Sequence, residues 1–229
     1  KILEDKNINI WKLNSTRKFL DNTGLQHYQE GDIGNMYGYQ WRHAGFEYIN
    51  YNYDYSGKGF DQINYCINLL KNDPYSRRII MTTFDPSQSF KGVLYPCHGI
   101  VVQWYVQENQ EIYYLSCHMY QRSADMFLGV PFNITSYALL TYMMCEVINN
   151  DLSYNGYKFK PDKLIISFGD LHIYESHKEA VNEQLSRIPN LFPKLRFNRQ
   201  ISDFKDFEFQ DIIIDNYIYY PSIKAEMIA

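Results

Sequence analysis

The feature that most constrains the fold is an uncharged segment, residues 129–145, that separates two stretches rich in β-branched and aromatic side chains. Apolar residues recur in and just after this segment at helical spacing, which predicts a buried central helix that Asn133 caps and that ends near Ile148. Pro131 and several amide and hydroxyl side chains interrupt it, so it falls short of the ~20 apolar residues that a membrane span needs. Its expected buried face comprises Ile134, Tyr137, Leu140, Thr141, Met144 and Ile148.

Shorter elements surround this helix on both sides. Gly59 and Pro74 bracket an amphipathic helix, residues 174–187 read as a more polar helix, and residues 14–24 as a short helix that ends at a glycine. The glycine-rich segment 31–43 is expected to be a loop. Strands are predicted over residues 79–84, 99–106, 112–120, 163–168, 195–197 and 212–218, of which the second and third form an antiparallel hairpin. Because strands and helices are mixed and no linker or repeat is visible, we expect one α/β or α+β domain over residues 1–229.

The charge balance restricts the class of partner. The chain has 22 Lys and Arg against 26 Asp and Glu, and a net charge of −4 argues against a general DNA-binding or membrane-binding surface. Residues 1–6 alternate in charge and lack the apolar core of a secretory signal. The four cysteines contain no C-x-x-C pair, so free thiols and a cytoplasmic location are expected.

Two Cys-His pairs, Cys97-His98 and Cys117-His118, are candidates for chemistry. A zinc site is disfavoured, since adjacent strand residues point to opposite faces and cannot easily converge on one ion; we expect no metal. A single catalytic thiol is the better interpretation, and Pro96 places Cys97 near the end of a strand rather than inside the core. A thiol is nucleophilic only as the thiolate, which a neighbouring cation favours.

Three arginines are expected at strand ends, where a guanidinium can bind a phosphate with paired hydrogen bonds. They are Arg77, Arg78 and Arg122. Each of them, taken alone, is more typical of a solvated surface charge than of a phosphate site.

Several motifs, taken in order, resemble the thymidylate synthase family over essentially the whole chain. They are YGYQWRH at 37–43, DPYSRR at 73–78, YPCH at 95–98, YQRSAD at 120–125, LGVPFNI at 128–134, GDLHIY at 169–174 and KAEMIA at 224–229. The resemblance implies a three-layer α/β fold with a large mixed β-sheet and flanking helices. It also implies reductive methylation of dUMP to dTMP, in which 5,10-methylene-tetrahydrofolate supplies carbon and hydride and no metal takes part.

The resemblance also assigns roles to the residues of these motifs. Cys97 would add to uracil C6, Arg122 and Ser123 would bind the phosphate, and Arg122 would help hold the thiolate. Asn133 would face the pyrimidine edge, where an amide can donate to O4 and accept from N3–H. His98 and Tyr37 would belong to a polar network that moves protons, and His172 and Tyr174 would bind the deoxyribose hydroxyl.

The same resemblance implies a folate site and a partner. Arg77 and Arg78 would reach the phosphate from the second subunit of a homodimer with shared active sites. Asp125 would accept a hydrogen bond from the pterin, beside the substrate. The other residues implied around the folate are Trp11, Asn14, Leu128, Gly129, Phe132 and Met227.

The chain departs from the family pattern at its start, since the loop arginine and the glutamate expected upstream of Trp11 have no counterpart. We therefore expect part of a longer protein, such as the synthase part of a bifunctional dihydrofolate reductase-thymidylate synthase, with an upstream disordered segment and a degenerate relative as alternatives. Two other functions stay open: a pyrimidine nucleotide hydroxymethylase, and a non-catalytic nucleotide-binding or RNA-binding relative. Asn133 opposes a cytosine hydroxymethylase, and Trp11 opposes the access of water.

Overall fold

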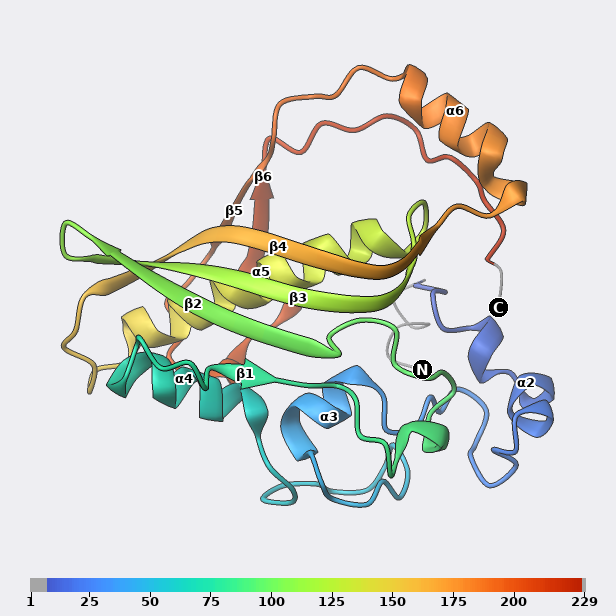
Figure 1. Ribbon diagram of the computed structural model, residues 1–229, viewed down its shortest axis with the longest axis horizontal. Coiled ribbons are helices and arrows are strands. Elements are labelled where there is room, and N and C mark those ends of the chain that lie inside the picture. Colours follow the sequence, from blue (N-terminus) through green and yellow to red (C-terminus); the bar gives the residue numbers. More distant parts are fainter. Residues whose placement is uncertain (1–7, 228–229) are drawn as a thin grey trace.

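The computed structural model describes residues 8–227 and is built on one mixed β-sheet (Figure 1). The sheet has the order β1-β2-β3-β4, with bounds Ile80–Met81, Val101–Asn109, Ile112–Asp125 and Lys158–His172. Its first two pairings are antiparallel and the pairing of β3 with β4 is parallel. The predicted α/β class, with a mixed sheet and flanking helices, is confirmed.

The hairpin of β2 and β3 is confirmed, but β3 is longer than predicted. Gln110 and Glu111 connect the strands with φ angles of 50° and 60°. Positive φ at both positions is required by the two-residue hairpin turn whose twist matches that of the strands. The strand continues past residue 120 because β4 pairs with it up to Asp125. Residues 121–125 are therefore held in a strand and do not lie beyond its end.

Helix α5, Gly129–Asn150, connects β3 to β4 and covers one face of the sheet together with α4, Gln62–Asn72. The parallel pairing of β3 and β4 requires such a crossover, because the chain must return to the end of the sheet where β3 began before β4 can start. The largest fully buried side chains of this layer include Trp104, Tyr137, Met144 and Phe159. Burying such side chains contributes about 1.5–3 kcal/mol each, so this interface is a main source of stability.

The predicted cap of α5 at Asn133 is wrong. The helix begins one turn earlier, because the Asp125 carboxylate accepts hydrogen bonds from the backbone N–H groups of Phe127 and Leu128 and organises the turn that leads into it. Asn133 is buried in the helix, and its side-chain oxygen accepts a hydrogen bond from Gln121. The Asn133 side chain therefore does not cap the helix, and its amide N–H group can hydrogen-bond a ligand.

Smaller elements differ from the sequence-based expectations mainly at their ends. The segment expected as one helix over 14–24 divides at Thr16, which caps α2 through its hydroxyl. The segment expected as a loop over 31–43 contains helix α3, and β1 and β6 are shorter than predicted. The bounds are η1 Leu13–Ser15, α2 Arg17–Asn22, α3 Tyr37–His43, η2 Ser89–Lys91, η3 Glu175–His177, α6 Lys178–Ser186, β5 Lys194–Phe197, η4 Phe204–Asp206, η5 Phe209–Asp211 and β6 Ile212–Asp215.

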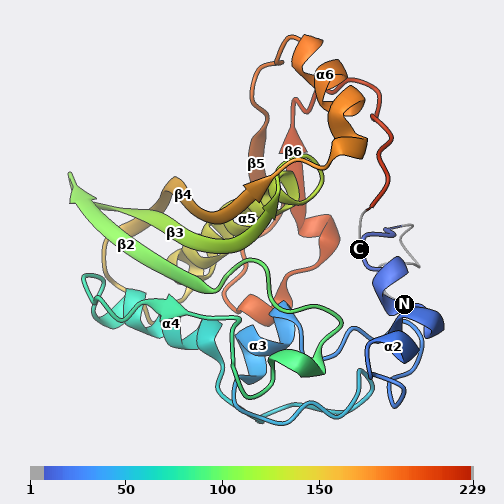
Figure 2. The same ribbon diagram turned by 45° about the vertical axis from the view of Figure 1, so that its right-hand side comes forward.

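The two views of the ribbon agree on how these parts are layered. The antiparallel pair of β5 and β6 lies on the helical side of the main sheet, and α6 extends beyond the end of β4 (Figure 2). A second, smaller core is formed around α2 and α3 by Leu20, Leu25, Tyr28, Met36 and Val93. No helix within residues 8–227 has both the length and the apolar character that crossing a membrane requires.

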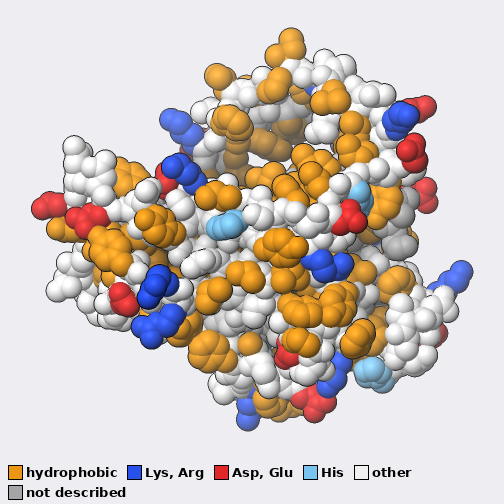
Figure 3. Space-filling view, viewed as in Figure 1, with side chains coloured by type: hydrophobic (Ala, Val, Ile, Leu, Met, Phe, Trp, Pro, Cys, Tyr) orange, Lys and Arg blue, Asp and Glu red, His pale blue; other side chains and the backbone are white. Residues whose placement is uncertain are grey.

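The face of the main sheet opposite α5 is exposed and partly apolar. Figure 3 shows apolar side chains distributed over this side of the molecule. Tyr105 is 63% exposed and Ile165 is 47% exposed, although both lie on strands of the sheet. Cys117 is buried, whereas the neighbouring His118 hydrogen-bonds Ser167, so the two side chains point to opposite faces.

Candidate active site

Cys97 lies in the loop before β2 and is held against the end of β3. The backbone N–H groups of Arg122 and Ser123 donate to the Cys97 carbonyl oxygen over 2.8 and 3.4 Å. Gly99 allows the loop to turn there, because its φ is 65° and an added Cβ would lie 2.3 Å from the Tyr137 hydroxyl oxygen. The thiol is thus partly exposed at the strand end, as the sequence predicted.

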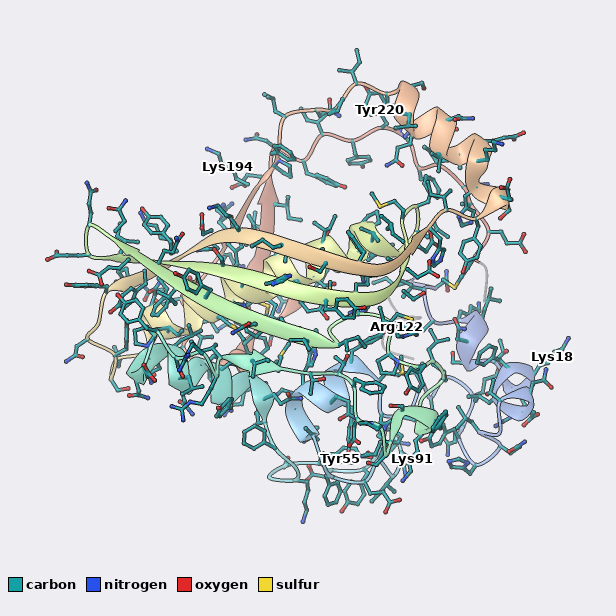
Figure 4. All side chains as sticks on the ribbon, viewed as in Figure 1. Lys18, Tyr55, Lys91, Arg122, Lys194 and Tyr220 are labelled. Carbon is teal, nitrogen blue, oxygen red and sulfur yellow. The ribbon has the colours of Figure 1, made fainter. Side chains whose placement is uncertain are left out.

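Arg122 places a cation next to this thiol. Its Nη2 atom lies 3.5 Å from Cys97 Sγ and donates to the Tyr95 carbonyl, while its Nε donates to the Pro96 carbonyl over 3.1 Å. Figure 4 shows Arg122 between β3 and the loop that precedes β2. Because these bonds leave part of the exposed guanidinium free, the same group can face both the sulfur and an anion.

The other three cysteines have environments that keep them as thiols. Burial raises the pKa of the Cys66 thiol to about 12 and that of Cys117 to about 12, and burial also raises the pKa of Cys145. All three are packed in the core between the sheet and its helices. Cys97 is therefore the cysteine that an external electrophile can reach among the described residues.

A network of neutral polar groups lies directly behind Cys97. The Tyr37 hydroxyl accepts a hydrogen bond from the Cys97 backbone N–H over 3.2 Å, and the Tyr37 ring stacks on His98 with centroids 3.9 Å apart. His98 Nδ1 lies 2.8 Å from the Tyr137 hydroxyl. Burial lowers the pKa of His98 to about 4 and raises the pKa values of Tyr37 and Tyr137, so all three groups are neutral near pH 7.

The lowered pKa of His98 predicts a loss of stability in acid. Between about pH 6.5 and pH 4 the unfolded chain binds a proton that folded His98 does not, so the free energy of unfolding decreases by up to about 3 kcal/mol as the pH falls. His98→Asn retains an acceptor for Tyr137 but does not titrate. We measure the free energy of unfolding with urea at about pH 7 and at about pH 4.5. Its decrease between these pH values should be about 2–3 kcal/mol smaller in this variant than in the parent. An equal decrease in both would exclude His98 as the cause.

The sequence predicts Tyr137 in the core and does not indicate Gln121 as a site residue. Gln121 is 2% exposed, and its Nε2 atom donates to Asn133 Oδ1 over 2.9 Å and to the Ser123 carbonyl over 3.1 Å. Its Oε1 atom is buried without a hydrogen-bond partner among the described residues. Only its position beside Arg122 in the motif could have identified Gln121, because a glutamine in a strand has no distinctive pattern.

The ends of β3 and β4 bring the residues expected at the deoxyribose and the folate close together. Asp125 pairs in register with His172, whose Nδ1 lies 3.0 Å from Asp170 Oδ1 and whose ring contacts that of Tyr174 edge-on. Leu128 and Gly129 follow Asp125 at the start of α5, and Phe132 is 58% exposed in its first turn.

The remaining expected residues lie in three further places. Trp11 approaches Tyr37 with ring centroids 6.1 Å apart, and Asn14 is buried in η1. Met227 follows Glu226, whose carbonyl oxygen accepts a hydrogen bond from His177.

Arg77 and Arg78 are exposed beside β1, and within residues 8–227 neither of them hydrogen-bonds or forms an ion pair with the Cys97 site. The last two residues of the 224–229 motif lie outside the described residues.

Comparisons with known proteins agree on one family. The family described as "Thymidylate synthase" matches residues 1–229. The chain is 45% identical over 230 residues to a thymidylate synthase from Agaricus bisporus and 44% identical over 244 residues to one from Candida albicans, covering 99% of this chain and 74% of each relative. It is 43% identical over 227 residues to a bifunctional dihydrofolate reductase-thymidylate synthase from Plasmodium chabaudi, of which it covers 36%.

Proposed function

Because this chain belongs to the thymidylate synthase family, we propose that it methylates dUMP reductively to dTMP, with 5,10-methylene-tetrahydrofolate as the source of carbon and hydride. The observation that carries this proposal is the contact of 3.5 Å between Arg122 Nη2 and Cys97 Sγ at the exposed end of β3. A cation beside a thiol favours the thiolate, and the free part of the guanidinium can bind the phosphate of the nucleotide.

The reaction requires a nucleophile, because uracil C5 is a poor carbon nucleophile until a group adds to C6. Cys97 Sγ forms a bond to C6, and the electron pair of the C5–C6 double bond moves toward O4. C5 would then attack the methylene carbon of the folate as the bond from that carbon to N10 breaks. Loss of the C5 proton would break the remaining bond to N5, which releases tetrahydrofolate and leaves an exocyclic methylene on the ring. Transfer of hydride from tetrahydrofolate to this methylene, with expulsion of Cys97 from C6, would restore the C5–C6 double bond and give dTMP and dihydrofolate.

Asn133 and the network behind Cys97 support the charge and proton movements of these steps. The Asn133 amide can donate to O4, where negative charge develops, and Gln121 holds its oxygen from the other side. The Tyr37 hydroxyl lies 3.2 Å from the Cys97 backbone nitrogen, and the His98 imidazole hydrogen-bonds the Tyr137 hydroxyl over 2.8 Å. These neutral hydroxyl and imidazole groups can accept and return a proton in this proposal. Ser123, His172 and Tyr174 bind the phosphate and the deoxyribose in this proposal.

The folate occupies the space next to the substrate, at the start of α5. Asp125 accepts from the pterin through the carboxylate oxygen that no backbone N–H occupies. Phe132, which is 58% exposed, offers an apolar surface beside it. The other residues assigned to this site are Trp11, Asn14, Leu128, Gly129 and Met227.

A homodimer completes the phosphate site in this proposal. Arg77 and Arg78 are exposed and, within residues 8–227, make no contact with their own Cys97 site, so the arginines of the partner subunit would bind the phosphate. The exposed, partly apolar sheet face that carries Tyr105 and Ile165 is the surface for pairing. Free cysteines fit a reducing cytoplasm, and the bifunctional relative supports a fused or associated dihydrofolate reductase.

The two alternative functions explain fewer features of the site. A cytosine hydroxymethylase would place an acid at position 133, and Trp11 near Tyr37 restricts water on the folate side. A module that only binds nucleotides or RNA gives no role to the contact between Cys97 and Arg122.

The proposal is tested by mass spectrometry of the intact chain after mixing with fluoro-dUMP and 5,10-methylene-tetrahydrofolate. Fluorine at C5 cannot leave as a proton does, so the covalent complex should accumulate. We expect a mass increase equal to nucleotide plus folate, and the modified peptide should contain Cys97. A mixture that leaves the mass unchanged, or modifies another cysteine, would contradict the mechanism.

A further inference from the structure

His177 is a buried histidine that none of the preceding roles uses. It is the last residue of η3, it is 0% exposed, and it lies where three separate parts of the chain meet. Its Nε2 atom is 2.7 Å from the carbonyl oxygen of Glu226, and its Nδ1 atom is 4.0 Å from Asp125 Oδ1. Phe127 and Tyr174 contact its ring, each with centroids 5.6 Å away.

The partner of Nε2 determines which way the imidazole donates. A backbone carbonyl can only accept, so His177 Nε2 carries a proton and donates it to Glu226. Nδ1 is buried without a hydrogen-bond partner among the described residues and faces the Asp125 carboxylate. The edge of Tyr174 fixes the plane of the ring, since the two rings meet at 78°.

This geometry connects groups that are assigned to different ligands. Asp125 is assigned to the pterin, Tyr174 to the deoxyribose, and Met227 follows the residue whose carbonyl His177 binds. The segment around Glu226 has no helix or strand of its own, so a hydrogen bond from a buried side chain is an effective anchor for it. Loss of that bond would leave the segment free to move away from the site.

We propose that His177 is a positioning residue that holds the C-terminal segment at Glu226 and Met227 against the turn carrying Asp125, and so completes the folate side of the site. This inference rests on the proposed function, because it takes Asp125 and Met227 as folate residues. The anchor itself is a feature of the folded chain and can be measured without turnover.

The test compares His177→Phe, which keeps an aromatic ring but loses the donor, with His177→Gln, whose amide can still donate to the Glu226 carbonyl. For His177→Phe we expect a KM for 5,10-methylene-tetrahydrofolate about tenfold higher, because one hydrogen bond to an anchoring carbonyl is lost. The dissociation constant of dUMP in the binary complex should stay within about twofold of the parent value, and His177→Gln should recover most of the loss.

A second measurement reads the anchor directly. Hydrogen exchange of the backbone amides of residues 224–227 should be faster in His177→Phe than in the parent by about tenfold, while exchange in α5 is unchanged. Glu226→Ala is the matched control, because His177 binds the backbone carbonyl and the exposed Glu226 side chain takes no part. This control should behave as the parent does in both measurements.

Several outcomes would overturn the proposal. Unchanged exchange at residues 224–227 in both variants would mean that His177 anchors nothing. An equal loss of dUMP and folate affinity, or His177→Gln no better than His177→Phe, would indicate a purely structural role. If the parent neither binds dUMP nor forms product, the proposed function fails, and the exchange measurement still decides whether His177 is an anchor.

Discussion

Replacing Cys97 by alanine is expected to abolish dTMP formation, with a loss of turnover on the order of 10⁶-fold, as when a catalytic nucleophile is removed elsewhere. The effect is chemical, because the variant has no group that can add to C6. Binding of dUMP should change by no more than about threefold. Arg122 keeps its position through hydrogen bonds to the carbonyls of Tyr95 and Pro96, which the substitution does not alter.

The matched control for Cys97→Ala is Cys66→Ala. Cys66 is fully buried in α4, and burial raises its pKa to about 12, so it is a small apolar group in the core and not a nucleophile. Its replacement should lower the free energy of unfolding by about 1 kcal/mol and leave turnover within about twofold. Steady-state rates, with urea unfolding of each variant, make the comparison. Measurable turnover in Cys97→Ala would disprove the covalent route.

The parts of the molecule that the sequence predicted correctly depend on local patterns. The hairpin of β2 and β3, the amphipathic α4 and the exposed strand-end position of Cys97 follow from side-chain periodicity and from breakers such as Pro96. The predicted elements differ from the observed ones where tertiary contacts decide. Pairing with β4 extends β3 to Asp125, and the turn organised by Asp125 moves the start of α5 away from Asn133.

The residues that the sequence did not identify are those whose roles come from packing. Tyr137 lies among the apolar side chains of α5. Its hydroxyl can reach His98 because Gly99 has no side chain to occupy that space. Gln121 and His177 likewise acquire partners from other elements, at Asn133 and at Glu226. A periodic pattern shows which face of an element is buried but does not show which polar group will meet it there.

The choice of base is expected to depend on Asn133, and Asn133→Asp should change it. Asn133 Oδ1 accepts from Gln121 over 2.9 Å, and a carboxylate retains that bond, so the variant should fold. A carboxylate cannot donate to O4 of uracil and repels the charge that develops there, but it can accept from the amino group of cytosine.

An enzyme discriminates strongly against a substrate that leaves buried polar groups of the site without hydrogen-bond partners. The ratio of kcat/KM for dUMP to kcat/KM for dCMP should therefore fall by about 10³-fold or more. Asn149→Asp is the matched control: the Asn149 amide donates to the Phe159 carbonyl at the start of β4, so the change removes a structural hydrogen bond away from Cys97. That variant should lose stability by about 1–3 kcal/mol and keep the parent preference for dUMP. Competition between the two nucleotides in one reaction measures the ratio, and a ratio that Asn133→Asp leaves at the parent value would remove Asn133 from the base-recognition site.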